Sequence, residues 1–259
     1  MRKSSLTACL LLVSLFVVSN GQNGAADRAG AGASFGYRFE NTRFHIPLIE
    51  IDLASDGTGE LRFKRGESDE IIDLKLRLLP ATMERIRTLY SATGFLTSKD
   101  EYQSKKDFSN LGWITLSARE GGLMREARLN YSENHQIREL YEIFRAIATQ
   151  QMHLFDLDIA EQYQPLDLPT QLRVLERDLE LERIAEPEQM LAALRNINSN
   201  DSLPLIARNH AKRIADSIEK KKFKTPVKKQ KSEARSQKTE VIRVASGSAP
   251  HHAPRTPDF

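Results

Sequence analysis

The sequence predicts an α+β protein: an antiparallel sheet with helices on one face, in the order β-β-β-α-β-β-α, followed by a small all-α segment and a disordered tail. In several short segments between residues 49 and 131, single apolar and polar residues alternate, which is typical of half-buried strands. Two segments between 80 and 152 instead carry apolar residues at helical spacing. The last 40 residues are basic and poor in apolar side chains, which favours disorder.

The first 21 residues have the pattern of a secretory signal peptide. Arg2 and Lys3 precede an apolar stretch at 6–18, and the small residues Ser19 and Gly21 stand at the expected cleavage site. As a helix this stretch would reach about 20 Å, short of the ~30 Å hydrocarbon core of a bilayer. We therefore expect a cleaved signal and a periplasmic or extracellular protein. Retention of the stretch as an anchor, and with it association with the membrane, is the alternative.

Cleavage would also remove the single cysteine of the chain, Cys9. A mature chain without cysteine excludes disulfides, thiol catalysis and cysteine-based zinc sites. Residues 22–34, which follow the expected cleavage site, are rich in Gly and Ala without periodicity and are predicted to be a flexible leader.

Residues 35–151 are predicted to form the α+β domain, which begins with a β-hairpin. Leu53 is expected to face Leu61, and Ile51 to face Phe63, across a loop at 56–58. The later elements follow from the same two periodicities and from turn and cap residues. They are a strand at 72–78, a helix at 80–94, a polar loop at 97–110, strands at 113–119 and 123–131, and a helix at 134–152.

Residues 152–219 are predicted to be a helical segment. Its helices are expected at 170–183, 186–196 and 202–220, with Ser202 as the cap of the last one. The stretch 186–219 resembles a single HEAT-type helical hairpin. Since such repeats are stable only when about three of them stack, we expect this hairpin to pack on the α+β domain or on a partner.

The α+β region also resembles an uncharacterised family of exported bacterial α+β domains. The features that carry this resemblance are the hairpin at 46–65, Gly94-Phe95-Leu96 at a helix end, the polar Asp100-Glu101-Tyr102 loop that reaches Asp107, and the hairpin and helix at 113–150. The resemblance implies a fold and an exported location, and no catalytic residues come with it.

No known catalytic signature is present, so we assign no catalytic residues, no metal site and no cofactor. The motifs of zinc hydrolases, nucleophile elbows and phosphate-binding loops are all absent. Asp156 and Asp158 would share one face only on an extended segment, and they would diverge on a helix. Together with the polar loop at 97–110 they are the residues that an envelope hydrolase based on carboxylates would use.

The net charge of +3 conceals two regions of opposite sign. Residues 22–219 contain 25 basic and 32 acidic residues, whereas 220–259 contain 11 basic and 3 acidic ones, a net charge of +8. Such a basic tail can bind polyanions, although a purely solvated tail is the plain alternative. The lysines that would contact a polyanion are Lys220, Lys221, Lys222, Lys224, Lys228, Lys229 and Lys231.

The sequence as a whole favours an exported, non-enzymatic binding or interaction protein. The expected partner is an envelope protein, or else an anionic polymer or membrane surface. No nucleic acid is expected, because the protein is exported and Phe223 is the one aromatic residue in the lysine cluster. The alternatives are the carboxylate hydrolase and an electrostatic adaptor that acts through its basic tail. The oligomeric state is not predicted.

Overall fold

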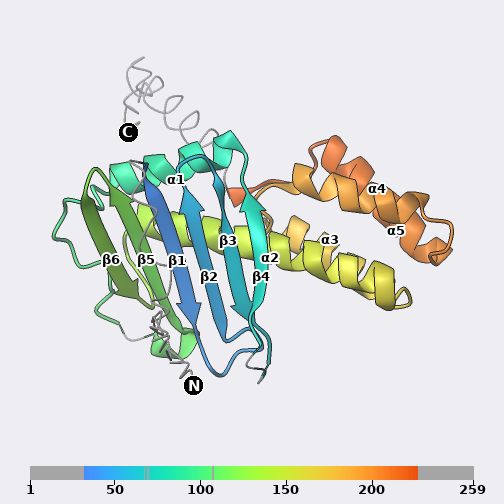
Figure 1. The fold of residues 1–259 in the computed structure, drawn as a ribbon, viewed down its shortest axis with the longest axis horizontal. Coiled ribbons are helices and arrows are strands. Elements are labelled where there is room, and N and C mark those ends of the chain that lie inside the picture. Colours follow the sequence, from blue (N-terminus) through green and yellow to red (C-terminus); the bar gives the residue numbers. More distant parts are fainter. Residues whose placement is uncertain (1–31, 67, 69, 107, 227–259) are drawn as a thin grey trace, which may run out of the picture. The chain divides into compact units, whose positions relative to one another are not determined.

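The computed structural model describes residues 32–66, 68, 70–106 and 108–226. The described residues confirm the α+β class, with one antiparallel sheet in the order β4-β3-β2-β1-β5-β6 (Figure 1). The strands are β1 (Ser34–Glu40), β2 (Leu48–Ala54), β3 (Thr58–Lys64), β4 (Ile72–Arg77), β5 (Trp113–Glu120) and β6 (Leu123–Leu129). The helices are α1 (Pro80–Ala92), α2 (His135–Tyr163), α3 (Leu168–Glu180), α4 (Leu191–Ser199) and α5 (Leu205–Glu219), with short 3-10 helices at Ser109–Leu111 and Pro187–Met190.

Strand β1 was not anticipated, and it lies in the middle of the sheet between β2 and β5. Its aromatic residues Phe35, Tyr37 and Phe39 alternate with Gly36 and Arg38, and all three aromatics are buried. The strand was missed because this alternation is short and directly follows the glycine-rich segment. The expected leader at 22–34 overlaps the strand at Ser34. The order of elements therefore begins with four strands instead of three.

The β2–β3 hairpin forms with the expected faces but with a different register. Ile51 lies opposite Leu61, so the expected pairing of Ile51 with Phe63 is wrong by two residues. The reason is the turn: Gly57 adopts a φ of 84° and donates its N–H to the carbonyl three residues earlier, which places the loop at 55–57. Because a shift of two residues keeps the parity, the same side chains remain buried.

The other elements of the α+β region agree with the sequence to within two residues, except for α2. Helix α1 begins at Pro80 and ends before Gly94, whose φ of 56° allows the amide of Phe95 to bond back to the carbonyl of Tyr90. Helices α1 and α2 lie against one face of the sheet (Figure 1). The opposite face carries charged side chains, among them Arg38, Glu50 and Arg62, which form ion pairs. Such a division is the usual pattern of antiparallel sheets.

Helix α2 is longer than expected and continues eleven residues beyond Met152. Its start is as predicted, with the Asn134 side chain accepting a hydrogen bond from the Ile137 amide at 3.1 Å. The expected division of the chain at 151/152 therefore falls inside one helix. Phe144 belongs to the core under the sheet, whereas Leu157, further along the same helix, belongs to a second core with the later helices.

Helices α3, α4 and α5 surround this second core, in which Leu172, Leu194 and Ile214 are fully buried. The expected cap of the last helix is wrong: Pro204 occupies the N-cap position, and the Ser202 hydroxyl donates instead to the Asn200 side chain at 2.6 Å. Proline suits this place because its nitrogen lacks a proton that would need a partner. Among the described residues, no helix is long and apolar enough to span a membrane.

A buried carboxylate, Glu186, connects the helical segment to the sheet. Its side chain accepts a hydrogen bond from the Leu79 amide at 2.8 Å, directly before α1, and a second one from Gln189. Its own amide donates to Gln150 on α2 at 2.7 Å. Since Glu186 is only 2% exposed, burial raises the pKa of its carboxyl above the ordinary value.

We expect replacement of Glu186 by glutamine to change the pH dependence of stability. The raised pKa means that the folded protein binds this proton more tightly than the unfolded chain does. The contribution of Glu186 to the free energy of unfolding is therefore present below the ordinary pKa and is lost as the pH rises through the raised value. Denaturant unfolding at several pH values between 4 and 8 should show the Glu186→Gln variant gaining on the wild type as the pH rises. A Glu84→Gln control, at an exposed site on α1, should track the wild type; equal behaviour of the two variants would contradict the prediction.

Candidate functional site

The structure separates the two acidic residues singled out in the sequence. Asp156 and Asp158 both lie on α2, where neighbouring positions point in different directions. The Asp156 carboxylate forms an ion pair with Arg65, just after β3, at 2.6 Å. The Asp158 carboxylate accepts a hydrogen bond from Gln162 on its own helix at 2.7 Å. The two carboxylates therefore do not act on one point.

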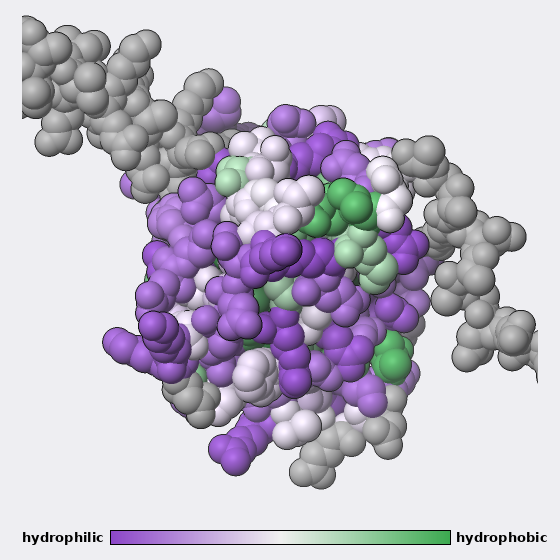
Figure 2. Space-filling view, turned by 90° about the vertical axis from the view of Figure 1, so that its left-hand side faces the viewer, coloured by the Kyte–Doolittle hydropathy of each residue, from purple (hydrophilic) through white to green (hydrophobic). Residues whose placement is uncertain are grey.

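The polar loop at 97–110 lies beside β6, away from both carboxylates. Gln103 of this loop donates to the Asn130 side chain at 2.8 Å, and Arg125 on β6 donates to the carbonyl of Phe95 at the same distance. Figure 2 shows that the surface at this end of the molecule is mainly hydrophilic, with small hydrophobic areas. The carboxylate arrangement expected for a hydrolase is thus not assembled.

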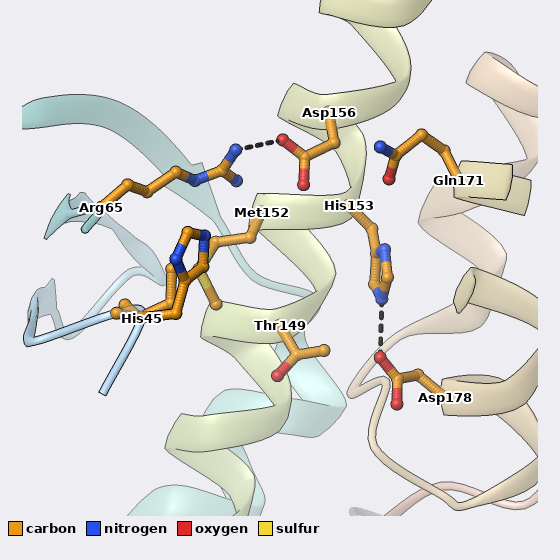
Figure 3. Close-up of a pocket in the computed structure, with 9 residues that line it drawn as sticks. His45, Arg65, Thr149, Met152, His153, Asp156, Gln171 and Asp178 are labelled. Carbon is orange, nitrogen blue, oxygen red and sulfur yellow. Dashed lines mark hydrogen bonds and ion pairs between the residues drawn. The ribbon is translucent and has the colours of Figure 1, made fainter. Parts of the chain in front are cut away.

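A polar cavity of about 350 Å³ lies between the sheet and the helical segment (Figure 3). Four segments line it: the loop between β1 and β2, the residue after β3, one face of α2, and α3. Its polar side chains are His45, Arg65, Thr149, His153, Asp156, Gln171 and Asp178. The volume falls within the range of about 300–1,000 Å³ that is typical of small-molecule sites.

Arg65 forms one wall of this cavity. Its guanidinium lies over the rings of Phe63 and Phe155, at 5.2 and 5.5 Å from their centroids, while its end reaches Asp156. The Nε atom is buried and has no hydrogen-bond partner. The two aromatic rings and the ion pair together hold the guanidinium in one position at the mouth of the cavity.

His153 and Asp178 form the opposite wall. His153 on α2 is buried, and its Nε2 lies 2.8 Å from the Asp178 carboxylate on α3. Burial alone would raise the pKa of Asp178, but the hydrogen bonds and charges of His153 and Arg183 outweigh it and lower that pKa. Asp178 therefore stays ionised at neutral pH and is not available as a general acid.

Three further polar side chains that line the cavity have no partner. The side chains of His45, Thr149 and Gln171 form no hydrogen bond with any described part of the chain. They come from the β1–β2 loop, α2 and α3, so they face the cavity from different sides (Figure 3). Convergent polar groups without partners are what a small-molecule site requires.

The seven candidate lysines divide between described and masked parts of the chain. Lys228, Lys229 and Lys231 lie outside the described residues. The segment 220–226, which the sequence analysis assigned to the tail, is described, and it follows directly on α5. The exposed residues of this segment are Lys220, Lys221, Lys222 and Lys224.

This segment is attached to the folded part of the protein. Phe223 packs against the second core, and Thr225 is only 3% exposed. Three of the exposed lysines precede Phe223 and the fourth stands between Phe223 and Thr225. They form no ion pair with a carboxylate in the part of the chain that the structure describes. We call Lys220–Lys224 the lysine ledge. It displays positive charge from an anchored backbone.

Two further histidines of the described residues lie on helices outside the cavity. His210 contacts Glu176 at 2.9 Å between α5 and α3, and His135 is exposed at the start of α2. Within residues 32–226, apart from the masked positions, no group of three or more His, Cys, Asp or Glu side chains could hold a metal ion.

Comparison of the chain with models of known protein families finds no match, and comparison with curated proteins finds none either. Asp156 and the lysines are recognisable as candidates in the sequence, whereas Arg65, His153, Gln171 and Asp178 are not recognisable there as parts of one site. Arg65 follows β3, His153 lies on α2, and Gln171 and Asp178 lie on α3, so no local pattern joins the three segments into one site.

Proposed function

We propose that the protein is exported and acts as a non-enzymatic binding protein that attaches to an anionic surface of the cell envelope. The observation that carries this proposal is the lysine ledge. Four lysines within five residues are exposed and lack acidic partners among the described residues, and Phe223 and Thr225 anchor their backbone. Residues 22–219 carry a net charge of −7, so the positive charge of the ledge contrasts with that of the chain before it.

The physical basis is electrostatic attraction to clustered phosphate or carboxylate groups. Each lysine close to an anionic membrane contributes about 1 kcal/mol of binding free energy. An anchored ledge loses less conformational entropy on binding than a free chain does, because its backbone is already ordered. The membrane is the favoured source of these anions, and a soluble envelope polymer is the other source of the same chemistry.

The structure supports the two alternatives, the carboxylate hydrolase and the electrostatic adaptor, to different degrees. A carboxylate hydrolase needs an acid with a raised pKa in a cleft, whereas the pKa of Asp178 is lowered and Asp156 is paired with Arg65. The geometry thus lends that alternative no support. The electrostatic adaptor, which acts through the basic tail, overlaps with our proposal, because the lysine ledge is the first part of that tail.

Binding to vesicles tests the proposal. We expect residues 22–259 to bind vesicles that contain phosphatidylglycerol and to ignore vesicles of pure phosphatidylcholine. The triple variant K220Q/K221Q/K222Q should bind about 100-fold more weakly, because it loses roughly 3 kcal/mol. Raising the ionic strength from 0.1 to 1 M should abolish binding, since the Debye length falls from about 10 to about 3 Å.

A matched variant separates the ledge from charge in general. K99Q/K105Q/K106Q removes three exposed lysines from the loop at 97–110 and should bind as the wild type does. Inorganic polyphosphate serves as the soluble arm. Tighter binding to polyphosphate than to vesicles would indicate that the partner is a soluble polymer and not the membrane. An equal loss of vesicle binding in both triple variants would refute the ledge as the binding site.

A further inference from the structure

We infer that the polar cavity between α2, α3 and the sheet is a binding site for a neutral, hydroxyl-rich molecule of monosaccharide size. This inference is independent of the lysine ledge. It depends on three properties of the cavity walls: their internal charge balance, their side chains without partners, and their side-by-side arrangement of donors and acceptors (Figure 3).

The charges in the cavity walls are already balanced. Arg65 is paired with Asp156, and Asp178 is paired with His153 and with Arg183 at 3.3 Å. A ligand with a net charge would therefore find no unpaired charge of opposite sign, and would have to compete with an existing pair. Moving a charge out of water without a partner is costly, so the balance favours a neutral ligand.

The polar groups without partners suit hydroxyl groups. Each ligand hydroxyl can donate one hydrogen bond and accept two. The Thr149 hydroxyl on α2 and the Gln171 amide on α3, which has both a donor and an acceptor end, offer complementary partners. The His45 ring is exposed at the rim and adds a further nitrogen.

The ion pair between Arg65 and Asp156 presents a donor next to an acceptor. Two hydroxyl groups on adjacent carbons can bond to such a pair together, one accepting from the guanidinium and the other donating to the carboxylate. Met152 and Ile46 supply apolar surface for the C–H groups of the same molecule. A sugar ring combines these two features, which neither a simple anion nor an apolar ligand does.

Titration with glucose and with glucuronate, which differ by one carboxylate, tests the inference. We expect NMR signals of the cavity to shift with glucose, with a dissociation constant on the order of 1 mM, as is common for a small polar ligand in an open site. Glucuronate should bind no better. Binding of glucuronate more than tenfold tighter than glucose, or no binding of any hexose or N-acetylhexosamine tested, would overturn the inference.

Two cavity variants locate the site without disturbing the fold. Thr149→Val and Gln171→Leu remove groups that have no partner in the described protein, so the melting temperature should stay unchanged. Each should weaken glucose binding by about two- to tenfold, which corresponds to the net contribution of one hydrogen bond. Thr115→Val on the polar face of the sheet and Gln136→Leu at an exposed site on α2 are the matched controls. Equal weakening in the controls would show that the site lies elsewhere.

The test is also separate from that of the proposed function. The variant K220Q/K221Q/K222Q, which should lose vesicle binding, leaves every wall of the cavity unchanged. It should therefore bind glucose as the wild type does, and loss of glucose binding in this variant would contradict the assignment of the ligand to the cavity.

Discussion

Replacing Phe144 by alanine should lower the free energy of unfolding by about 3–5 kcal/mol, the usual cost of removing a buried phenyl ring. Phe144 is fully buried on α2, and its ring stacks on Tyr37 of the central strand at a centroid distance of 5.4 Å. Few neighbouring groups can move into the space that the ring leaves, because both the helix and the strand are held by many other contacts. Denaturant unfolding of wild type and variant measures the loss.

The same experiment tests whether the two cores unfold together. Because α2 contributes to both, we expect a single transition, with coincident midpoints for the fluorescence of Trp113 in β5 and for the helical circular dichroism. Leu166→Ala, at a side chain that is 84% exposed, should change the free energy of unfolding by less than about 0.5 kcal/mol. Separate midpoints would show that the helical segment is an independent unit.

Removing the charge of Glu139 should also lower the free energy of unfolding by about 3–5 kcal/mol. This residue on α2 forms an ion pair with Arg85 on α1, and their side chains are only 11% and 7% exposed. Arg85 Nε donates to the carboxylate at 2.8 Å. A Glu139→Gln variant would remove the carboxylate that pairs with this buried guanidinium, which is costly.

A double variant distinguishes the cost of an unpaired charge from a loss of packing. Arg85→Met with Glu139→Leu removes both charges together and should recover most of the lost free energy, since apolar residues can replace a buried pair at little cost. Thermal or denaturant unfolding of the wild type and the two variants gives the comparison. A double variant no more stable than Glu139→Gln would mean that the pair is needed for its geometry. As an exposed control, Lys212→Ala breaks the pair with Asp216 and should cost below about 0.5 kcal/mol.

The candidate sites differ in how far the sequence could predict them. The lysine ledge is a local run of one residue type, so its charge was recognisable at once. Its anchoring was not, because Phe223 packs against a core that residues from several distant helices form. In the polar cavity, Asp156 was recognised as a candidate, but its partner Arg65 follows β3, far away in the sequence. The pairing of His153 with Asp178 joins two helices and has no sequence pattern.

The sequence by itself determined the class of fold, the faces of its elements and several of their ends. The alternation in β2 and β3, the cap at Asn134 and the stop at Gly94 are local features, so a few neighbouring residues suffice to specify them. Only the tertiary structure decided the hairpin register, the extra length of α2 and the cavity. A local pattern states which side of an element is buried, but the partner that buries it comes from elsewhere in the chain, and that partner sets where α2 ends and which polar groups meet.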